Sequence, residues 1–229
     1  DGSPEERAKW CVKREEAWGN WFKEEQSRCR LLVRLHLANK LLKYKCFYHP
    51  WSLDFRGRGY TVCELLSPQG ADFDKGLVFF AEARKQTEEG LYWLKVHVAN
   101  LFDQDKVSFD ERVAWVDENM DMFERISDDP YTNKEWISDK TKKNPSFQRL
   151  AAVFDLCRKD GLTQVPVQLD GACNGSQHWS AIMRDEIIAL LTNVLPSDKP
   201  QDLYGYIAEK TTEYCKQKMS EVPWYQEFM

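Results

Sequence analysis

One acidic residue stands where an apolar run meets a glycine. In VQLDGACNGSQHWSAIMRDE, residues 167–186, Asp170 ends the run and Gly171 follows it. A carboxylate at the end of a buried strand is held rigidly, and a glycine lets a ligand approach the backbone closely. Mg²⁺ takes oxygen ligands, usually one or two carboxylates with water and substrate phosphates, and the Gly171 carbonyl offers one more. The residues indicate either a metal site for phosphate chemistry or a turn Asp that caps a helix, which is the commoner case.

A second group, LDFRGR at residues 53–58, carries two arginines on either side of a glycine. An extended backbone points Arg56 and Arg58 the same way, and a turn brings them close. Guanidinium groups grip phosphate oxygens in pairs, and Asp54 is placed to orient one arginine by a salt bridge. The alternative is a surface loop pinned by an Asp–Arg pair.

Other chemistries have less support in the sequence. The four histidines show no ligand spacing, and no Ser-His-Asp grouping, H-E-x-x-H, Walker loop or G-x-G-x-x-G occurs. A phosphatase with an Asp nucleophile at a strand end wants a D-x-D pair, but position 168 is Gln. The acidic motif therefore favours metal-assisted phosphate chemistry over these classes.

Charge is unevenly distributed along the chain. The net charge is −5, yet residues 1–46 hold 11 basic against 7 acidic side chains. From Lys23 to Arg58 there are nine basic residues and three acidic ones. Such a stripe can meet phosphates in an acidic protein, although charge alone favours a solvated helix face.

Composition excludes several classes of protein. With 42% hydrophobic and 30% charged residues, the chain resembles an ordinary globular protein. No apolar run approaches the roughly 18 residues of a spanning helix, and no signal peptide is visible, so we expect a soluble protein. The seven cysteines are odd in number and lack C-x-x-C spacing, which favours reduced intracellular thiols over zinc or disulfides.

Periodicity predicts the elements that must hold these residues. Residues 5–45 contain almost no helix breaker and predict one long helix or a helix pair. We expect a strand at YTVCELL (60–66), another at GLVFFAEA (76–83), and a short one at VPVQLD (165–170). The long helix has an apolar stripe opposite its basic residues, formed by Leu31, Leu32, Leu35, Ala38, Leu41 and Leu42.

Further helices are predicted from capping signals and apolar stripes. Residues 87–102 have a helical stripe, and residues 108–126 open with a capping box, Ser108 with Glu111. Residues 127–144 are polar and predict a loop, and Asn144 with Pro145 predicts the start of a helix over 146–159. A helical apolar face runs from Trp179 to Val194, and residues 197–219 predict one more helix. The pattern is that of a mostly helical α+β fold.

Taken together, these motifs resemble one family. LDFRGRGY is similar to a D-x-x-G-R motif, and VQLDGACNGSQHWSAIMRDE to a motif with D-G-x-C-x-G-x-Q-H and R-D-E. GLYWLKVHVAN, DKVSF and LPSDKPQDLYG match in order and at compatible spacing. All resemble motifs of the single-subunit DNA-dependent RNA polymerases of bacteriophages and mitochondria. The likeness runs from about Tyr48 to Tyr206, and residues 1–46 fit that family's thumb more loosely.

The resemblance implies a right-hand polymerase fold. Residues 1–46 would be thumb helices, 47–186 the first part of the palm, and 187–229 the start of the fingers. Asp170 and Gly171 would bind metal, one of two Mg²⁺ ions needing ligands from outside this sequence. The DNA template, RNA product and nucleoside triphosphates would be the partners. Lys106 would contact the triphosphate, Arg56 and Arg58 the template or hybrid, and Arg184 and Tyr204 would line the active-site region.

The family's second palm motif, His-Asp-Ser, is not in the sequence. The resemblance therefore implies a chain that is inactive alone, either a truncation, which the lack of an initiating Met favours, or a natural split subunit completed by a second polypeptide. It would act inside a cell, in the host cytoplasm if viral or the mitochondrial matrix if organellar. The competing interpretation is a non-catalytic nucleic-acid-binding or assembly module with a palm-like fold.

Overall fold

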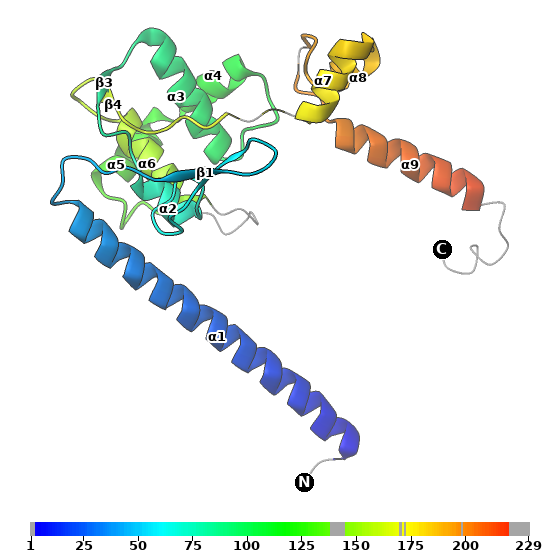
Figure 1. Cartoon of the computed structure of the whole chain (residues 1–229), viewed down its shortest axis with the longest axis horizontal. Coiled ribbons are helices and arrows are strands. Elements are labelled where there is room, and N and C mark those ends of the chain that lie inside the picture. The colour runs from blue at the N-terminus through cyan, green and yellow to red at the C-terminus, as the bar shows by residue number, and fades with distance from the viewer. Residues whose placement is uncertain (1–2, 138–144, 170, 172, 198, 220–229) are drawn as a thin grey trace. The chain divides into compact units, whose positions relative to one another are not determined.

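The computed structural model describes residues 3–137, 145–169, 171, 173–197 and 199–219 (Figure 1). Over these residues the chain is mostly helical with two small antiparallel sheets, β1–β2 and β3–β4, which is consistent with the predicted α+β class. The elements are α1 (Pro4–Leu41), β1 (Trp51–Leu53), β2 (Gly59–Thr61), α2 (Asp72–Leu77), β3 (Arg84–Lys85), α3 (Glu88–Leu101), α4 (Phe109–Glu118), α5 (Met120–Asp128), α6 (Ser146–Leu156), β4 (Leu162–Thr163), α7 (Asn174–Met183), α8 (Glu186–Leu191) and α9 (Leu203–Met219).

The chain divides into two compact units, and each is described by itself. The first unit comprises Asp1–Gln86 and Glu124–Pro166, and the second comprises Thr87–Phe123 and Val167–Met229. The division into compact units does not test the functional division into thumb, palm and fingers. The boundaries between thumb, palm and fingers, at 46/47 and 186/187, therefore stay a prediction.

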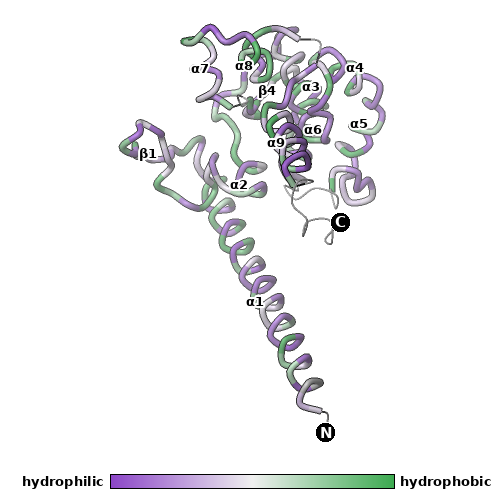
Figure 2. Tube along the Cα trace, turned by 90° about the vertical axis from the view of Figure 1, so that its right-hand side faces the viewer, coloured by the Kyte–Doolittle hydropathy of each residue, from purple (hydrophilic) through white to green (hydrophobic). Residues whose placement is uncertain are grey.

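Helix α1 confirms the predicted long helix but not a buried apolar face. Its side chains lie almost entirely in solvent, and hydrophobic and hydrophilic residues are mixed along its length (Figure 2). Leu32 is 65% exposed, and Leu31 and Leu35 are exposed as well. Most of this stripe therefore does not pack within its own unit, and only Ala38 and Leu41, at the C-terminal end of the helix, are half-buried.

Asp74 ties α1 to the rest of the first unit. Its carboxylate is fully buried and accepts a hydrogen bond from Arg34 Nε on α1 at 2.6 Å. The same carboxylate accepts the backbone N–H groups of Leu66 at 3.1 Å and Ala71 at 3.2 Å. Leu66 is buried with a positive φ of 52°, a conformation that costs energy for a side chain of this kind. One carboxylate thus fixes both the helix and the loop that follows β2.

Helices α2 and α6 pack at very close range. A Cβ at Gly76 would lie 2.8 Å from the backbone of Phe147, so only glycine fits there. Asp72 on α2 accepts the backbone N–H groups of Phe147 at 2.8 Å and Gln148 at 3.1 Å, which are at the start of α6. The predicted cap, Asn144, lies outside the described residues. A residue 75 positions earlier in the chain does the capping that we expected from a neighbour.

Helices α3 and α4 contribute buried side chains to the second unit, and helices at these positions were predicted. Thr87 caps α3, and Ser108 with Glu111 forms the expected capping box of α4. The predicted single helix over 108–126 is wrong, since it breaks at Asn119 into α4 and α5. The Asn119 side chain donates to the Trp115 carbonyl at 2.7 Å, a local bond that competes with helix continuation. The buried apolar side chains here include Leu94, Val96, Val98, Ala99, Val116 and Phe123.

Two predicted strands are wrong. GLVFFAEA lies partly in α2, because Gly76 packs on α6, and the strand β3 comes after it at Arg84–Lys85. None of the described residues of VPVQLD, 165–169, has a ladder partner, and the strand β4 precedes them at Leu162–Thr163. Where this segment begins, a side chain rather than a sheet accepts the Val165 N–H.

Membrane-spanning and disulfide features can be checked directly. Among the described residues, no helix combines the length and hydropathy needed to cross a membrane. All seven cysteines are free in the structure. Burial raises the pKa of the Cys157 thiol to about 11, so this cysteine stays protonated at neutral pH.

The Asp74 anchor predicts a large effect on stability. Asp74→Ala leaves the Arg34 guanidinium and two backbone N–H groups without their acceptor, so we expect a loss of about 3–5 kcal/mol in the free energy of unfolding. Glu25→Ala, which removes an exposed ion pair to Arg28 on the same helix, should cost under about 0.5 kcal/mol. Urea unfolding of both variants measures this, and equal effects would contradict the anchor.

His97 predicts how stability depends on pH. Its ring is buried on α3, and burial lowers its pKa from 6.5 to about 4. Below pH 6.5 the histidine of the unfolded chain binds a proton, whereas the His97 ring of the native chain stays neutral down to about pH 4. The stability contributed by the neutral ring is therefore complete above pH 6.5 and lost as the pH falls to about 4, by about 3 kcal/mol in total.

The test compares two histidine variants by urea unfolding at several pH values between about 4 and 7. His97→Asn should flatten the pH dependence of the unfolding free energy relative to the unmodified chain. His178→Asn, which changes an exposed ring on α7, should leave that dependence unchanged. A wild-type slope in the His97 variant would show that another group governs it.

Candidate functional site

Asp170, the residue on which the metal prediction rests, lies outside the described residues, as does Ala172. Its neighbours Leu169 and Gly171 are described, and both are exposed. The candidate site is therefore built from the segments that lead into and out of this position and from the other predicted residues.

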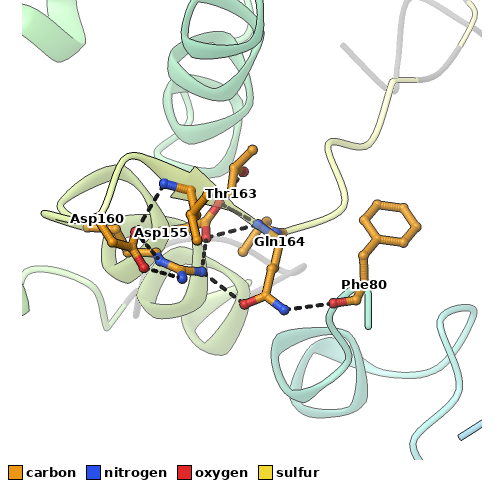
Figure 3. A network of polar contacts seen from close by, with 8 residues as sticks. Phe80, Asp155, Asp160, Thr163 and Gln164 are labelled. Atoms are coloured by element: carbon orange, nitrogen blue, oxygen red, sulfur yellow. Dashed lines mark hydrogen bonds and ion pairs between the residues drawn. The ribbon is translucent and has the colours of Figure 1, made fainter. Parts of the chain in front are cut away.

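A buried carboxylate fixes the chain shortly before the motif. Asp155 at the end of α6 is 3% exposed and accepts the Thr163 hydroxyl at 2.5 Å. It also accepts the backbone N–H of Gln164 at 3.2 Å and of Val165 at 3.4 Å (Figure 3). Three consecutive residues are thus held by one side chain, and the last of them stands five positions before Asp170.

Gln164 extends this network to another segment of the first unit. Its side-chain Nε2 donates to the Phe80 carbonyl at 3.0 Å, and the Phe80 N–H donates to the Gln164 carbonyl at 3.0 Å (Figure 3). Arg158 donates to the Gln164 side chain at 2.9 Å and pairs with Asp160 at 2.6 Å. Asp160 is the main cause that raises the pKa of Arg158. The hydrogen bonds drawn in Figure 3 hold the backbone where the predicted strand VPVQLD would begin.

Strained backbone bounds the helix that follows the motif glycine. Cys173 before α7 has φ 60° and Arg184 after it has φ 53°, both in the left-handed region. A Cβ at Gly171 would lie 2.1 Å from the Asn174 side-chain oxygen. The predicted need for glycine at 171 therefore has an internal cause, the Asn174 side chain. Strain of this kind persists only where surrounding contacts impose it, and it concentrates at functional sites.

The helical face predicted from Trp179 to Val194 is divided into two helices. Asp185 caps α8 by accepting the Ile188 N–H at 3.0 Å. Gln177 on α7 donates to the carbonyl of the fully buried Thr192 at 2.7 Å, which joins α7 to the end of α8. Several apolar residues of the predicted face are exposed: Trp179, Ile182, Met183, Ile187, Leu190 and Val194.

Arg184 and Tyr204 lie on separate elements of the second unit. Arg184 is exposed at the end of α7, and Tyr204 is exposed in the first turn of α9. A hydrogen bond with Cys173 raises the pKa of the Tyr204 hydroxyl, so the motif cysteine and this tyrosine are in contact. The second unit also has an apolar pocket of about 300 Å³, lined by Gly175, Ser176, Trp179, Ile188, Leu203 and Ile207.

The two arginines of LDFRGR lie on one turn between β1 and β2. Asp54 accepts the backbone N–H groups of Arg56 and Arg58, each at 2.9 Å, and Gly57 has a φ of 77° that favours glycine. The Arg56 guanidinium donates to Asp54 at 2.9 and 3.0 Å, which confirms the proposed salt bridge. The Arg58 N–H is the first cause that lowers the pKa of Asp54. The carboxylate therefore shapes the turn and holds Arg56.

Arg56 and Arg58 therefore differ in what they can bind. Arg56 is committed to Asp54 and also lies over the Phe55 ring at 5.6 Å. Arg58 is exposed, and none of the described residues pairs with its guanidinium. A phosphate would meet Arg58 without breaking an existing ion pair.

Lys106 is exposed on a loop whose backbone carbonyls accept hydrogen bonds from a buried arginine. Its side chain is 86% exposed and lies 3.4 Å from the Asp105 carboxylate. Arg112 on α4 is 6% exposed and donates to the carbonyls of Asp105 and Val107, both at 2.9 Å, and to Asn100 at 2.7 Å. Burial lowers the pKa of Arg112, but the guanidinium stays charged. The two carbonyls on either side of Lys106 are thus fixed.

The described residues do not by themselves make a metal centre. Within them, no group of three or more His, Cys, Asp or Glu side chains is placed to hold an ion. The Gly171 carbonyl and the Asp170 carboxylate are oxygen donors of the kind that Mg²⁺ prefers, but two donors do not complete a site. The magnesium prediction therefore depends on Asp170 and on ligands from outside this sequence.

Sequence reasoning missed the residues that hold these segments. No special spacing in the sequence marks four of these residues, namely Arg112, Asp155, Gln177 and Gln69. Arg112 directly follows Asp110 and Glu111 in the first turn of α4, so its neighbours in the sequence do not mark it as a buried charge. The others act through contacts that span 8 to 15 positions of the chain, beyond the spacings of a helical or strand pattern.

Comparison with known proteins gives the same assignment as the motifs. The family described as DNA-dependent RNA polymerase matches residues 84–227. The DNA-directed RNA polymerase of Enterobacteria phage T3 is 38% identical over 195 residues, covering 83% of this chain and 22% of the phage protein. The T7 RNA polymerase of Escherichia phage T7 is 37% identical over 191 residues, which are 81% of this chain and 21% of that protein.

A relative from a cell organelle agrees. The mitochondrial DNA-directed RNA polymerase of Schizosaccharomyces pombe is 35% identical over 221 residues, 93% of this chain and 19% of that protein. The chain thus spans about a fifth of the length of these relatives. On this basis the chain belongs to the family of single-subunit DNA-dependent RNA polymerases found in bacteriophages and mitochondria.

Proposed function

We propose that the chain is part of a DNA-directed RNA polymerase that transcribes DNA by nucleotidyl transfer with two metal ions. Residues 1–46 serve as thumb helices, residues 47–186 as the first part of the palm, and residues 187–229 as the start of the fingers. Family membership and the order of the motifs support this assignment. The observation that carries it among the described residues is the Asp54 turn, which leaves Arg58 exposed for a phosphate.

Each predicted residue then has a chemical role. Asp170 and the Gly171 carbonyl hold Mg²⁺, with the remaining ligands from outside this sequence. Bound there, magnesium ions neutralise developing charge and lower the pKa of the attacking 3′-hydroxyl. Lys106 places a cation near the triphosphate leaving group. Arg56 and Arg58 contact the template or hybrid backbone, and Arg184 and Tyr204 line the active-site region.

We further infer that this chain is catalytically incomplete. One aspartate cannot hold two divalent ions, and the sequence has no His-Asp-Ser motif. Exposed apolar side chains on α1 and on α7 and α8 support the presence of further polypeptide that covers them. That polypeptide, a second chain or a longer form of this one, supplies the remaining fingers and the second palm aspartate. The DNA template, RNA product and nucleoside triphosphates complete the partners.

Phosphate binding by Arg58 is tested by the salt dependence of DNA affinity. Arg58→Ala should weaken binding of the chain to a DNA primer–template and lower the slope of log K against log salt by about 0.9, because one phosphate contact is lost. Lys159→Ala makes the same charge change at an exposed lysine with no predicted role and should leave the slope unchanged. Fluorescence anisotropy at several salt concentrations measures both. Equal slopes for the two variants would refute the phosphate contact.

Catalytic incompleteness is tested by nucleotide incorporation. The purified chain alone should incorporate no nucleotide, whereas addition of the polypeptide from the same source that carries His-Asp-Ser should restore synthesis. Asp170→Ala should then lower the restored rate by at least about a hundredfold, since loss of a metal ligand costs more than loss of its supporting residues. Asp121→Ala, at an exposed carboxylate of α5, is the control.

Two outcomes of this assay would overturn the proposal. Incorporation by the purified chain alone would show that it is complete. Full synthesis by the Asp170→Ala variant would favour the non-catalytic nucleic-acid-binding or assembly module instead.

A further inference from the structure

We propose that Gln69 is a positioning residue that holds the β1–β2 hairpin so that Arg58 is presented to a phosphate. The inference rests on the proposed function, because it concerns the residue that we expect to contact nucleic acid. Gln69 lies outside the turn and 11 residues after Arg58, so nothing in the LDFRGR motif points to it.

The Gln69 side chain bonds to the free edge of β2. Its Oε1 accepts the Thr61 N–H at 3.0 Å, and its Nε2 donates to the Gly59 carbonyl at 2.9 Å. These are the two backbone groups that a third strand would bond at this edge. One amide side chain therefore does the work of a neighbouring strand, and it does so at the residue immediately after Arg58.

The loop that carries Gln69 is itself fixed to the fold. The Gln69 N–H donates to the Ser67 hydroxyl at 3.1 Å, and this hydroxyl lies 2.6 Å from that of Thr61. Ser67 is 3% exposed, and the preceding Leu66 is anchored by Asp74. The Leu66 carbonyl oxygen also lies 2.8 Å from His49 Nε2. The amide of Gln69 is thus presented from a loop with a fixed backbone.

The hairpin depends on the two Gln69 hydrogen bonds because few other contacts restrain it. Each strand has three residues, and a two-stranded hairpin of this size is marginal by itself. Trp51 and Leu53 on β1 are 55% and 76% exposed, so burial does not hold the strand. Asp54 shapes the turn internally but bonds only to residues within the hairpin. Gln69 connects the hairpin to the remainder of the unit from the Arg58 side.

The experiment is a double-mutant cycle on the full chain with a DNA primer–template as the probe. Gln69→Leu keeps the approximate size of the side chain and removes both bonds without changing charge. We expect it to weaken binding about 3- to 10-fold, because Arg58 must then be ordered on binding. It should also lower the salt slope toward that of Arg58→Ala, although no charge is removed. Gln26→Leu, at an exposed glutamine of α1, is the matched control.

The double variant separates positioning from a general structural effect. Gln69→Leu with Arg58→Ala should bind no more weakly than Arg58→Ala alone, because both changes act on one contact. Hydrogen exchange of the Thr61 amide should accelerate in Gln69→Leu while amides of α2 and α6 keep their protection.

Three results would overturn the inference. Additive losses in the double variant, or an unchanged slope in Gln69→Leu while Arg58→Ala lowers it, would show that Gln69 does not act through Arg58. If Arg58→Ala itself leaves the affinity and slope unchanged, the phosphate contact of the proposed function fails, and the positioning role fails with it. The Arg58 variant therefore distinguishes failure of this inference from failure of the proposed function.

Discussion

Buried backbone amides and carbonyls need hydrogen-bond partners, and the strands of this chain are too short to supply them. In the part of the chain that the structure describes, the two sheets have strands of only two and three residues. Carboxylates supply acceptors where a ladder is missing. Asp74 takes the amides of the loop after β2, Asp155 those after β4, and Asp72 those at the start of α6. Because a buried carboxylate needs several donors, Asp74 and Asp155 each draw separate segments together, and the half-buried Asp72 joins α2 to α6 in the same way.

The same device holds the segments that carry the proposed chemistry. Asp54 and Gln69 act on the Arg58 turn, Arg112 on the loop of Lys106, and Asp155 on the chain before the motif of Asp170. For Arg58 and Lys106, the exposed side chain to which we assign a function is separate from the polar group that fixes its backbone. Functional groups on loops gain precision from such support, since the loop backbone has no regular ladder of its own. The charged side chain stays available for a ligand while its backbone is ordered in advance.

This division explains what the sequence could and could not predict. The long helix α1, helix α3 and the capping box of Ser108 and Glu111 follow from local signals, and the structure confirms them. The Asp54–Arg56 pair is also local, two residues apart. The strand predictions failed because apolar β-type residues at 76–83 and 165–169 lack strand partners, and packing of Gly76 on Phe147 or bonds from Asp155 decide the backbone there. Caps and clasps from residues such as Asp72 and Gln69 join positions that no local pattern connects.

The exposed apolar residues follow a different logic from the polar supports. Trp18, Trp21 and Phe22 contact one another on α1 yet are each at least half exposed, and Trp179 and Ile182 on α7 are more so. Polar supports such as Asp74 and Asp155 are satisfied within the first unit, so its local geometry requires no further polypeptide. The exposed apolar faces, in contrast, contribute to stability only when another surface covers them and removes them from water. Under the proposed function, assembly therefore buries apolar surface and supplies the missing aspartate in one event, while the Arg58 turn and the Lys106 loop are already formed.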